Sequence, residues 1–291
     1  MIDLHIHTTT SDGSDEPKDI LIKAQQLDLK YISITDHNSL GAYEKLKDIN
    51  IHNYFQGKLI PGCEFSAVHN GKPIEILGYG IDFDTIASSG LISDANFYER
   101  ENDYLKKLIE ICKNLNLKYS NNLSIDGKYF ATQIIHNDLR KYPENKKHLG
   151  TEVYESMNVF YRTCINNVES PFFIDMLKDW FTVEEVAATI KKAGGKSFLA
   201  HLYGYYADNY EDFLNSIISL NALDGVECYH SLHSIEKTKQ LLNYCKEHNL
   251  YACGGSDYHG KLKPSVKMGE SIIDTKIPFD ILKPWLPSNV I

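Results

Sequence analysis

The sequence predicts an α/β fold in which parallel strands alternate with helices. Short apolar runs, many of them β-branched, recur along the chain, and several end abruptly at polar residues. Segments with the periodicity of amphipathic helices lie between several of these runs. Strands that alternate with helices are typical of parallel βα units, so the two observations together favour this class.

Each predicted strand is a short run bounded by polar or turn residues. The runs are Ile2–Ile6, Tyr31–Thr35, Leu59–Cys63, Ile74–Gly78, Ser197–Ala200, Gly225–Tyr229 and Tyr251–Gly254. One helix is predicted over Pro17–Leu27 and another over Val183–Ala193. Thr182 and Glu185 form a capping box at the start of the second helix, which supports that boundary.

The alternation lapses between residues 93 and 179. Tyr104, Leu108 and Leu115 fall at helical spacing, whereas the stretch from Gly127 to Phe173 has no clear period. The length of 291 residues suits one barrel of about 250 residues with an insertion as well as two domains of about 150 residues. We predict a barrel in two segments, residues 1–92 and 180–291, with a mainly helical insertion over residues 93–179.

The composition is that of an ordinary globular protein. The chain is 43% apolar and 24% charged, and its formal net charge of −9 disfavours binding of long duplex nucleic acid through a broad basic surface. The six cysteines form no C-x-x-C pair, and no apolar run approaches the length of a membrane span. We expect a cytoplasmic protein with reduced thiols and no membrane partner.

Residues that can bind metal ions stand at the ends of several predicted strands or in the loops after them. They are His5, His7, Asp12, His37, Glu64, His201, Asp257 and His259. The strand ends of a parallel barrel open on one face, so these side chains are expected to converge there. Imidazoles mixed with carboxylates suit Zn²⁺, Mn²⁺ or Fe²⁺ better than Ca²⁺, and the set exceeds what one ion needs. Two or three divalent ions are predicted, although any one of these residues taken alone is more often a turn residue or a helix cap.

The motifs around these residues resemble those of the polymerase and histidinol phosphatase (PHP) family. The resemblance rests on Asp3-Leu4-His5-Ile6-His7, Ile34-Thr35-Asp36-His37-Asn38, Gly62-Cys63-Glu64-Phe65-Ser66, Ala200-His201-Leu202 and Gly255-Ser256-Asp257-Tyr258-His259. The spacing is most similar to that of stand-alone members that hydrolyse nucleoside 3′,5′-bisphosphates and degrade short RNA from its 5′ end. The Gly127–Ala131 stretch matches their Gly-Arg-x-His-x pattern only loosely.

The resemblance implies a distorted (β/α)7 TIM-like PHP barrel with two or three Mn²⁺, Fe²⁺ or Zn²⁺ ions. It implies that the eight residues at the strand ends are the metal ligands, and that Asp257, His201 and His37 carry catalysis. Glu75 stands where these relatives have a histidine. A carboxylate is a harder ligand and adds a negative charge, so Glu75 is either a ninth ligand or a surface residue on a strand.

These features predict a metal-dependent phosphoesterase that hydrolyses a phosphomonoester or phosphodiester of a nucleotide or short oligonucleotide by metal-activated hydroxide. His230 and His233 follow the sixth predicted strand and are candidate substrate contacts, with a helix-capping segment around Ser231 or Ser234 as the alternative. Further candidate phosphate contacts are the cations Lys128, Arg140 and Lys263. The alternative for each is a solvated surface side chain, which is the more common case for lysine and arginine.

Three other functions compete with this prediction. The nearest is an L-histidinol-phosphate phosphatase of the same family, which differs in its leaving group. An amidohydrolase barrel also begins with H-x-H, but it normally brings a metal-bridging lysine from its fourth strand, and Ile74–Gly78 contains none. A non-catalytic PHP binding or regulatory module belongs to another class, and loss of activity should have erased ligands that this chain retains.

Overall fold

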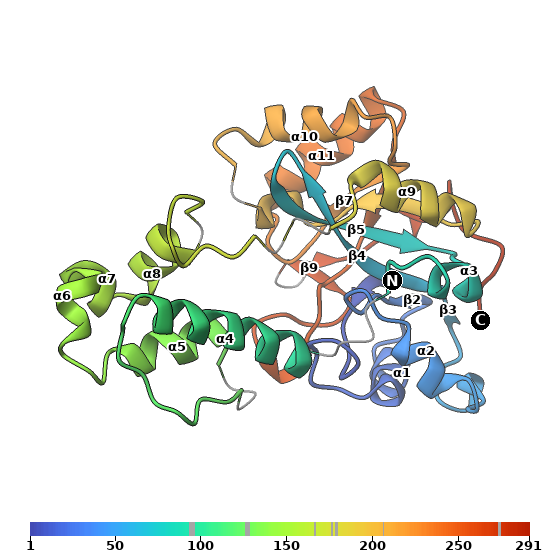
Figure 1. Cartoon of the computed structure of the whole chain (residues 1–291). Coiled ribbons are helices and arrows are strands. Elements are labelled where there is room, and N and C mark those ends of the chain that lie inside the picture. The colour runs from blue at the N-terminus through green and yellow to red at the C-terminus, as the bar shows by residue number, and fades with distance from the viewer. Residues whose placement is uncertain are drawn as a thin grey trace. The chain divides into compact units, whose positions relative to one another are not determined.

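The computed structural model describes residues 1–92, 97–125, 129–165, 167–175, 177, 180–205, 207–272 and 275–291. The chain divides into two compact units, whose elements are labelled in Figure 1. Unit 1 comprises residues 1–94 and 179–291, and unit 2 comprises residues 95–178. Each unit is described below by itself.

The described strands of unit 1 form sheets with the orders β1-β2-β3, β4-β5-β6-β7-β8 and β10-β9. The strands are β1 (Ile2–Ile6), β2 (Tyr31–Ile34), β3 (Lys58–Leu59), β4 (Gly62–His69), β5 (Lys72–Tyr79), β6 (Lys196–Leu199), β7 (Gly225–Tyr229), β8 (Tyr251–Gly254), β9 (Glu270–Ile272) and β10 (Thr275–Lys276). The first sheet is parallel, and β6, β7 and β8 are parallel to one another. These pairings confirm the predicted α/β class with parallel strands.

Strand β5 departs from the predicted parallel pattern. It pairs antiparallel with both β4 and β6, and it forms a long hairpin with β4 (Figure 1). The hairpin turns at Asn70 and Gly71, whose φ angles of 50° and 71° both lie in the left-handed region. Two such residues in succession fit the two-residue turn whose twist matches that of the strands, and Asn-Gly is its strongest sequence signature. The third predicted run is also divided, because Pro61 lies between β3 and β4.

Two isolated bridges link segments of the separate sheets. Ile6 at the end of β1 pairs with Tyr258 beyond β8, and His37 beyond β2 pairs with Glu64 in β4. These bridges hold the carboxyl ends of β1 and β2 beside residues from the five-stranded sheet. The strand pairings of the described residues do not by themselves form one closed barrel.

Helices accompany the strands of unit 1. They are α1 (Pro17–Gln26), α2 (Gly41–Leu46), α3 (Phe83–Ala87), α9 (Val183–Lys192), α10 (Tyr210–Ile218) and α11 (Ile235–Glu247). The predicted capping box of α9 is present, because the Glu185 N–H donates to the Thr182 hydroxyl and the Thr182 N–H donates to the Glu185 carboxylate. Pro17 occupies the first turn of α1, where its missing N–H costs no hydrogen bond.

The core of unit 1 fixes the strands that carry the candidate site. Tyr79 on β5 is fully buried, donates its hydroxyl to the Leu4 carbonyl of β1 over 2.9 Å, and packs on Phe198 and Trp285. Ile74 and Ile76 are also buried, so the intervening Glu75 points to the opposite face of β5. The alternation along β5 therefore places the Glu75 carboxylate on the same face as the buried Leu77 and Tyr79.

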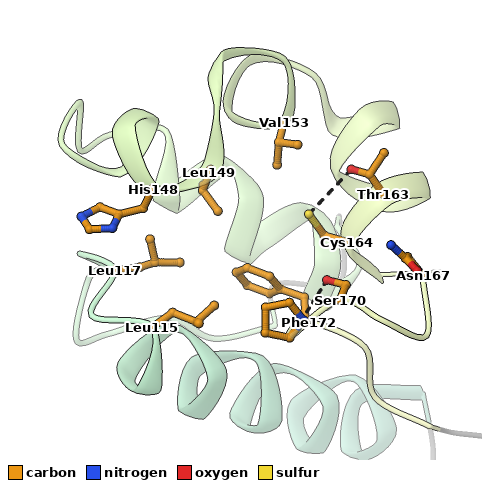
Figure 2. A pocket seen from close by; sticks show the side chains of 11 residues that line it. Leu115, Leu117, His148, Leu149, Val153, Thr163, Cys164, Asn167, Ser170 and Phe172 are labelled. Atoms are coloured by element: carbon orange, nitrogen blue, oxygen red, sulfur yellow. Dashed lines mark hydrogen bonds between the residues drawn. The ribbon is translucent and has the colours of Figure 1, made fainter.

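Unit 2 is helical over its described residues. Its helices are α4 (Phe97–Asn114), α5 (Ala131–Leu139), α6 (Asn145–Leu149), α7 (Thr151–Glu155) and α8 (Met157–Phe160), followed by a π-helical turn over Tyr161–Ile165. Its own buried cluster includes Leu108, Ile135 and Phe160. A pocket of about 450 Å³ within this unit is bordered by Leu115 and Phe172 and contains none of the predicted site residues (Figure 2).

Across the described part of the chain, no helix combines the length and the apolar character that crossing a bilayer requires.

The stability of unit 2 is expected to fall in mild acid because of His136. This side chain is fully buried, stacks on Phe160, and donates its Nε2–H to the Val153 carbonyl over 2.9 Å. Burial lowers the pKa of His136, and the charge of Arg140 lowers it further. The unfolded chain therefore binds more protons below about pH 6.5, so stability is fully present above that pH and falls as the pH drops towards the folded pKa.

We expect hydrogen exchange of α5 to accelerate between pH 7.5 and 5.5, after correction for intrinsic rates, more in the wild type than in His136→Gln. NMR titration of the His136 ring protons provides the direct check. A His136 pKa at or above that of a solvent-exposed histidine would contradict this account.

Candidate metal centre

The predicted ligands of unit 1 converge on one cluster of side chains. His5 lies on β1, Glu64 on β4 and Glu75 on β5. The other members follow strands: His7 and Asp12 come after β1, His37 after β2, His201 after β6, and Asp257 and His259 after β8. Successive contacts link all nine residues.

Glu64 stands at the centre of the cluster. Its Oε2 lies 3.2 Å from His5 Nε2, 3.2 Å from His7 Nε2 and 3.2 Å from His37 Nδ1. The side chain is only 1% exposed, yet this oxygen has no hydrogen-bond partner of acceptable geometry among the described residues. His5 Nε2 and His7 Nε2 also face each other at 3.1 Å. A carboxylate oxygen and two imidazole nitrogens, all able to bind a metal ion, thus face one another in a buried space.

A second group lies around Asp12. One carboxylate oxygen is 3.3 Å from His7 Nδ1, and the other is 3.2 Å from His259 Nε2 and 3.6 Å from His37 Nε2. His259 donates its Nδ1–H to the backbone carbonyl of Asp257 over 2.8 Å, which leaves the lone pair of Nε2 directed at the group. This hydrogen bond selects the tautomer that a metal ligand needs.

Glu75 belongs to the same cluster. Its two carboxylate oxygens lie 3.2 Å from His37 Nδ1 and 3.0 Å from His201 Nε2. His201 Nε2 is also 3.0 Å from Glu64 Oε1. The backbone of Glu75 is held by Tyr205, whose hydroxyl accepts from the Glu75 N–H over 2.9 Å and lies 3.3 Å from its carbonyl.

Asp257 joins His5 and His7 to the residues after β7. Its Oδ1 lies 3.6 Å from His5 Nε2 and 3.2 Å from His7 Nε2, and its Oδ2 lies 3.4 Å from His230 Nε2. Lys263 donates to the same Oδ2 over 2.7 Å. His230 accepts a hydrogen bond from the Leu232 N–H at Nδ1, so the neutral ring carries its proton on Nε2.

The charges of the cluster depend on one another. Burial disfavours the imidazolium form of His5, but the carboxylates of Glu64 and Glu227 outweigh that effect and raise the pKa of His5 to about 10. Burial likewise opposes protonation of His7 and His201, yet carboxylate contacts raise the pKa of both rings well above the usual value. Burial would raise the pKa of Glu64, but the rings of His5, His37 and His201 hold it well below its usual range.

The arrangement fits divalent metal ions. Nitrogen and oxygen ligands bound at about 2.0–2.2 Å to one ion lie about 3.0–3.4 Å apart, and the separations around Glu64 are of this size. Four groups of these side chains have ligand atoms close enough to share an ion: His7, Asp12, His37 and His259; His5, His7 and Glu64; His5, His230 and Asp257; and His37, Glu64 and Glu75. Zn²⁺, Fe²⁺ and Mn²⁺ all accept a mixed set of nitrogen and oxygen donors such as this one.

Glu227 is a site residue that the sequence analysis missed. It is fully buried on β7, where its Oε1 accepts from His5 Nδ1–H over 2.9 Å and its Oε2 accepts from the His201 N–H over 2.8 Å. The first bond turns the lone pair of His5 Nε2 towards Glu64, and the second fixes the backbone of another predicted ligand. The available sequence clue was a charged residue inside the apolar run Gly225–Tyr229.

Asp36, which neighbours the predicted ligand His37, shapes the loop that carries Asp12. It is buried and accepts from the N–H and hydroxyl of Thr8, from the Thr10 hydroxyl and from the Ser11 hydroxyl. These bonds consume its acceptor capacity, so Asp36 positions the loop and leaves Asp12 free to face the histidines.

The remaining predicted contacts differ in their surroundings. His233 donates Nδ1–H to the Cys228 carbonyl, and its buried Nε2 has no hydrogen-bond partner among the described residues. Burial lowers the pKa of His233 to about 4, so its ring is neutral near pH 7. Arg140 lies at the end of α5 in unit 2, and its role as a phosphate contact stays a prediction. Lys128 lies outside the described residues.

We expect Glu227→Gln to weaken metal binding about 10- to 100-fold while the fold is retained. The two carboxylate oxygens of Glu227 accept from His5 and from the His201 N–H, whereas glutamine has one oxygen and would turn its NH₂ group, a donor, towards one of these two donors. Metal content by mass spectrometry after dialysis and Mn²⁺ titration by calorimetry provide the measurement. The exposed Glu247→Gln is the matched control. Unchanged affinity in Glu227→Gln would show that this contact does not orient a ligand.

The chain is similar to known proteins of one family. Residues 3–249 match the PHP domain. The chain is 24% identical to the 5′-3′ exoribonuclease Rnm of Salmonella typhimurium, covering 99% of this chain and 90% of that protein. It is 25% identical to a phosphoribosyl 1,2-cyclic phosphate 1,2-diphosphodiesterase of Eggerthella lenta, covering 89% of this chain and 94% of that protein.

Two further comparisons agree with this assignment. The chain is 24% identical to a 3′,5′-nucleoside bisphosphate phosphatase of Chromobacterium violaceum over 89% of its length, covering 87% of that protein. A solved structure described as a metal-dependent phosphoesterase from Bifidobacterium adolescentis has the same fold, with a TM-score of 0.62, 22% identity, and coverage of 98% of this chain and 95% of that one. The chain belongs to the PHP domain family and is a phosphoric ester hydrolase.

Proposed function

We propose that the protein hydrolyses a phosphomonoester or phosphodiester of a nucleotide or short oligonucleotide at a centre of two or three Mn²⁺, Fe²⁺ or Zn²⁺ ions. The observation that carries the proposal is the buried Glu64 Oε2 with imidazole nitrogens of His5, His7 and His37 each 3.2 Å away. A divalent cation shared among this carboxylate and the three imidazoles would satisfy donor atoms that the protein alone leaves without hydrogen-bond partners of good geometry, such as Glu64 Oε2.

The ions would be held by the residues predicted from the sequence: His5, His7, Asp12, His37, Glu64, Glu75, His201, Asp257 and His259. When bound, such ions lower the pKa of water towards neutrality and neutralise the charge of a phosphoryl group. The protein contributes the fixed positions of the ligands, since Glu227 and Asp36 hold the segments that carry them.

His230 and Lys263 are suited to substrate contact. The neutral His230 ring carries its proton on Nε2, which has no hydrogen-bond partner of good geometry, so it offers a donor to a phosphate oxygen or a leaving alkoxide. The Lys263 ammonium is partly exposed and lies beside Asp257, where it offers a positive charge at the edge of the cluster. The His233 ring packs against the His230 ring, with the two centroids 5.3 Å apart.

The substrate proposal follows the chemistry of the named relatives. An exoribonuclease, a cyclic phosphodiesterase and a bisphosphate phosphatase all act at phosphate esters of ribose. L-Histidinol phosphate is the alternative substrate. The local positive charge that the ions supply makes the net charge of −9 compatible with an anionic nucleotide.

The proposal includes the architecture. The bridges from Ile6 to Tyr258 and from His37 to Glu64 support a distorted (β/α)7 barrel, and the insertion over residues 93–179 is proposed as a separate domain. The free cysteines among the described residues are consistent with a cytoplasmic location.

We expect Mn²⁺-dependent phosphate release from adenosine 3′,5′-bisphosphate that exceeds release from L-histidinol phosphate. A short 5′-phosphorylated RNA and phosphoribosyl 1,2-cyclic phosphate complete the panel. Chelation should abolish activity and Mn²⁺ should restore it. Faster turnover of L-histidinol phosphate would replace this substrate assignment.

His37→Ala and Asp257→Ala should each lower kcat/KM by at least about 10³-fold, because each removes a side chain that several cluster contacts share. His52→Ala and Asp280→Ala, exposed residues outside the cluster, are matched controls that should keep activity. Circular dichroism and thermal melting check the fold. Full activity in either cluster variant would count against the proposed centre.

A further inference from the structure

The metal centre has one corner whose donor atoms differ from the rest. His7, His37 and His259 surround Asp12 with three imidazoles to one carboxylate. His5, His7 and Glu64 form a group with two imidazoles to one carboxylate, whereas His37, Glu64 and Glu75 form a group with one imidazole to two carboxylates. We define the last three residues, with the adjoining His201, as the Glu75 corner. Its two imidazoles and two carboxylates still give it a larger share of oxygen donors than the other groups have.

Glu75 is built into this corner. It alternates with the buried Ile74 and Ile76, and its backbone carbonyl accepts from the Ala200 N–H over 3.0 Å in addition to its contacts with Tyr205. Its carboxylate reaches two different imidazoles through its two oxygens. A surface glutamate on a strand would not have both its backbone and its carboxylate fixed in this way.

The Glu75 corner is also more open than the donors around His5. The side chains of His37 and Glu75 are 21% and 28% exposed, whereas His5 and His7 are fully buried and Glu64 is 1% exposed. An ion bound beside His37 and Glu75 therefore has water close by, and its ligands can be exchanged without opening the core. An ion held between His5, His7 and Glu64 lacks that access.

At the Glu75 corner, openness is combined with an oxygen-rich donor set, whereas the Asp12 group is also open, with Asp12 34% exposed, but is rich in nitrogen. Nitrogen-rich groups favour borderline ions such as Zn²⁺ and Fe²⁺, whereas carboxylate oxygens suit harder ions such as Mn²⁺ and Mg²⁺. The buried Glu64 Oε2, which has no hydrogen-bond partner of its own, faces His37 in this corner and supplies one of the oxygens.

We propose that the Glu75 corner is a distinct, exchangeable site for a hard divalent cation, Mn²⁺ or Mg²⁺, while the nitrogen-rich groups retain borderline ions. This inference rests on the proposed metal centre and deepens it. The centre then fills in two steps, because the nitrogen-rich groups hold their borderline ions tightly and the open, oxygen-rich corner loads after them. The free concentration of the hard cation sets the occupancy of that corner.

The test measures metal binding and not turnover. The full-length protein is stripped with a chelator, reloaded with equimolar Zn²⁺ and Mn²⁺, and passed through a desalting column. Inductively coupled plasma mass spectrometry then gives the number of Zn²⁺ and Mn²⁺ ions retained per chain. In a separate titration, the electron paramagnetic resonance signal of free aqueous Mn²⁺ gives the Kd of weakly bound Mn²⁺. Wild type, Glu75→Gln, Glu75→His and the exposed control Glu44→Gln are compared.

For the wild type we expect retained Zn²⁺ and a weaker class of Mn²⁺ sites. Glu75→Gln should raise the Kd of that class at least about tenfold without changing the retained Zn²⁺. Glu75→His should shift the competition towards Zn²⁺ by about tenfold or more, because the corner gains a nitrogen. Glu44→Gln should behave as the wild type does.

Two results would overturn the inference. One is the same Mn²⁺ affinity and stoichiometry in wild type, Glu75→Gln and Glu75→His. The other is loss of the retained Zn²⁺ in Glu75→Gln, because the corner would then be part of the tight site. Wild-type protein that binds neither ion would instead overturn the proposed metal centre itself, so the two failures are distinguishable. Thermal melting of each variant excludes unfolding as the cause of a change.

Discussion

The pairing of one buried carboxylate with several imidazoles is the constraint on which the rest of unit 1 depends. A carboxylate as enclosed as Glu64 is costly to bury unless positive charge or donors surround it. His5, His7, His37 and His201 supply them from β1, from the segment after β2 and from the segment after β6. The fold must therefore hold separate strand ends so that a side-chain nitrogen from each lies 3.0–3.2 Å from a Glu64 oxygen, and the core packing around Tyr79 helps to fix these strands.

Two of the described non-glycine residues with positive φ lie where this convergence is tightest. Asp257 and Asn38 have φ angles of 59° and 44°, in the left-handed region where a residue with a side chain costs roughly 1–2 kcal/mol. Each is held by a bond across a junction between strands: the Asp257 N–H donates to the His5 carbonyl, and the Asn38 N–H donates to the Glu64 carbonyl. Asn38 also exchanges side-chain hydrogen bonds with Ser66. These two left-handed residues thus lie where β1 meets the end of β8 and where β2 meets β4.

Sequence patterns anticipated the parts of this arrangement that depend on local order. The run Ile2–Ile6 coincides with β1, and the capping box of Thr182 and Glu185 begins α9. The predicted parallel pattern does not include the hairpin of β4 and β5, because a period of two cannot distinguish a parallel from an antiparallel partner. The local sign of the hairpin is the Asn70-Gly71 turn. The convergence of the candidate ligands was expected from strand ends alone. Glu227 was missed because its partner His5 is 222 residues away in sequence, and only the fold shows that a charge inside an apolar run has an acceptor role.

The same carboxylates bear on how the centre handles protons. Without a cation, they raise the pKa of His5 to about 10 and those of His7 and His201 well above the usual value, so these rings hold protons at neutral pH. An imidazole binds a metal ion only after it has lost that proton, so metal ions and protons compete for the same nitrogens. Metal binding therefore releases protons and weakens as the pH falls. The buried carboxylates at this one place favour the binding of cations. The net charge of −9 therefore does not predict the local charge of the centre.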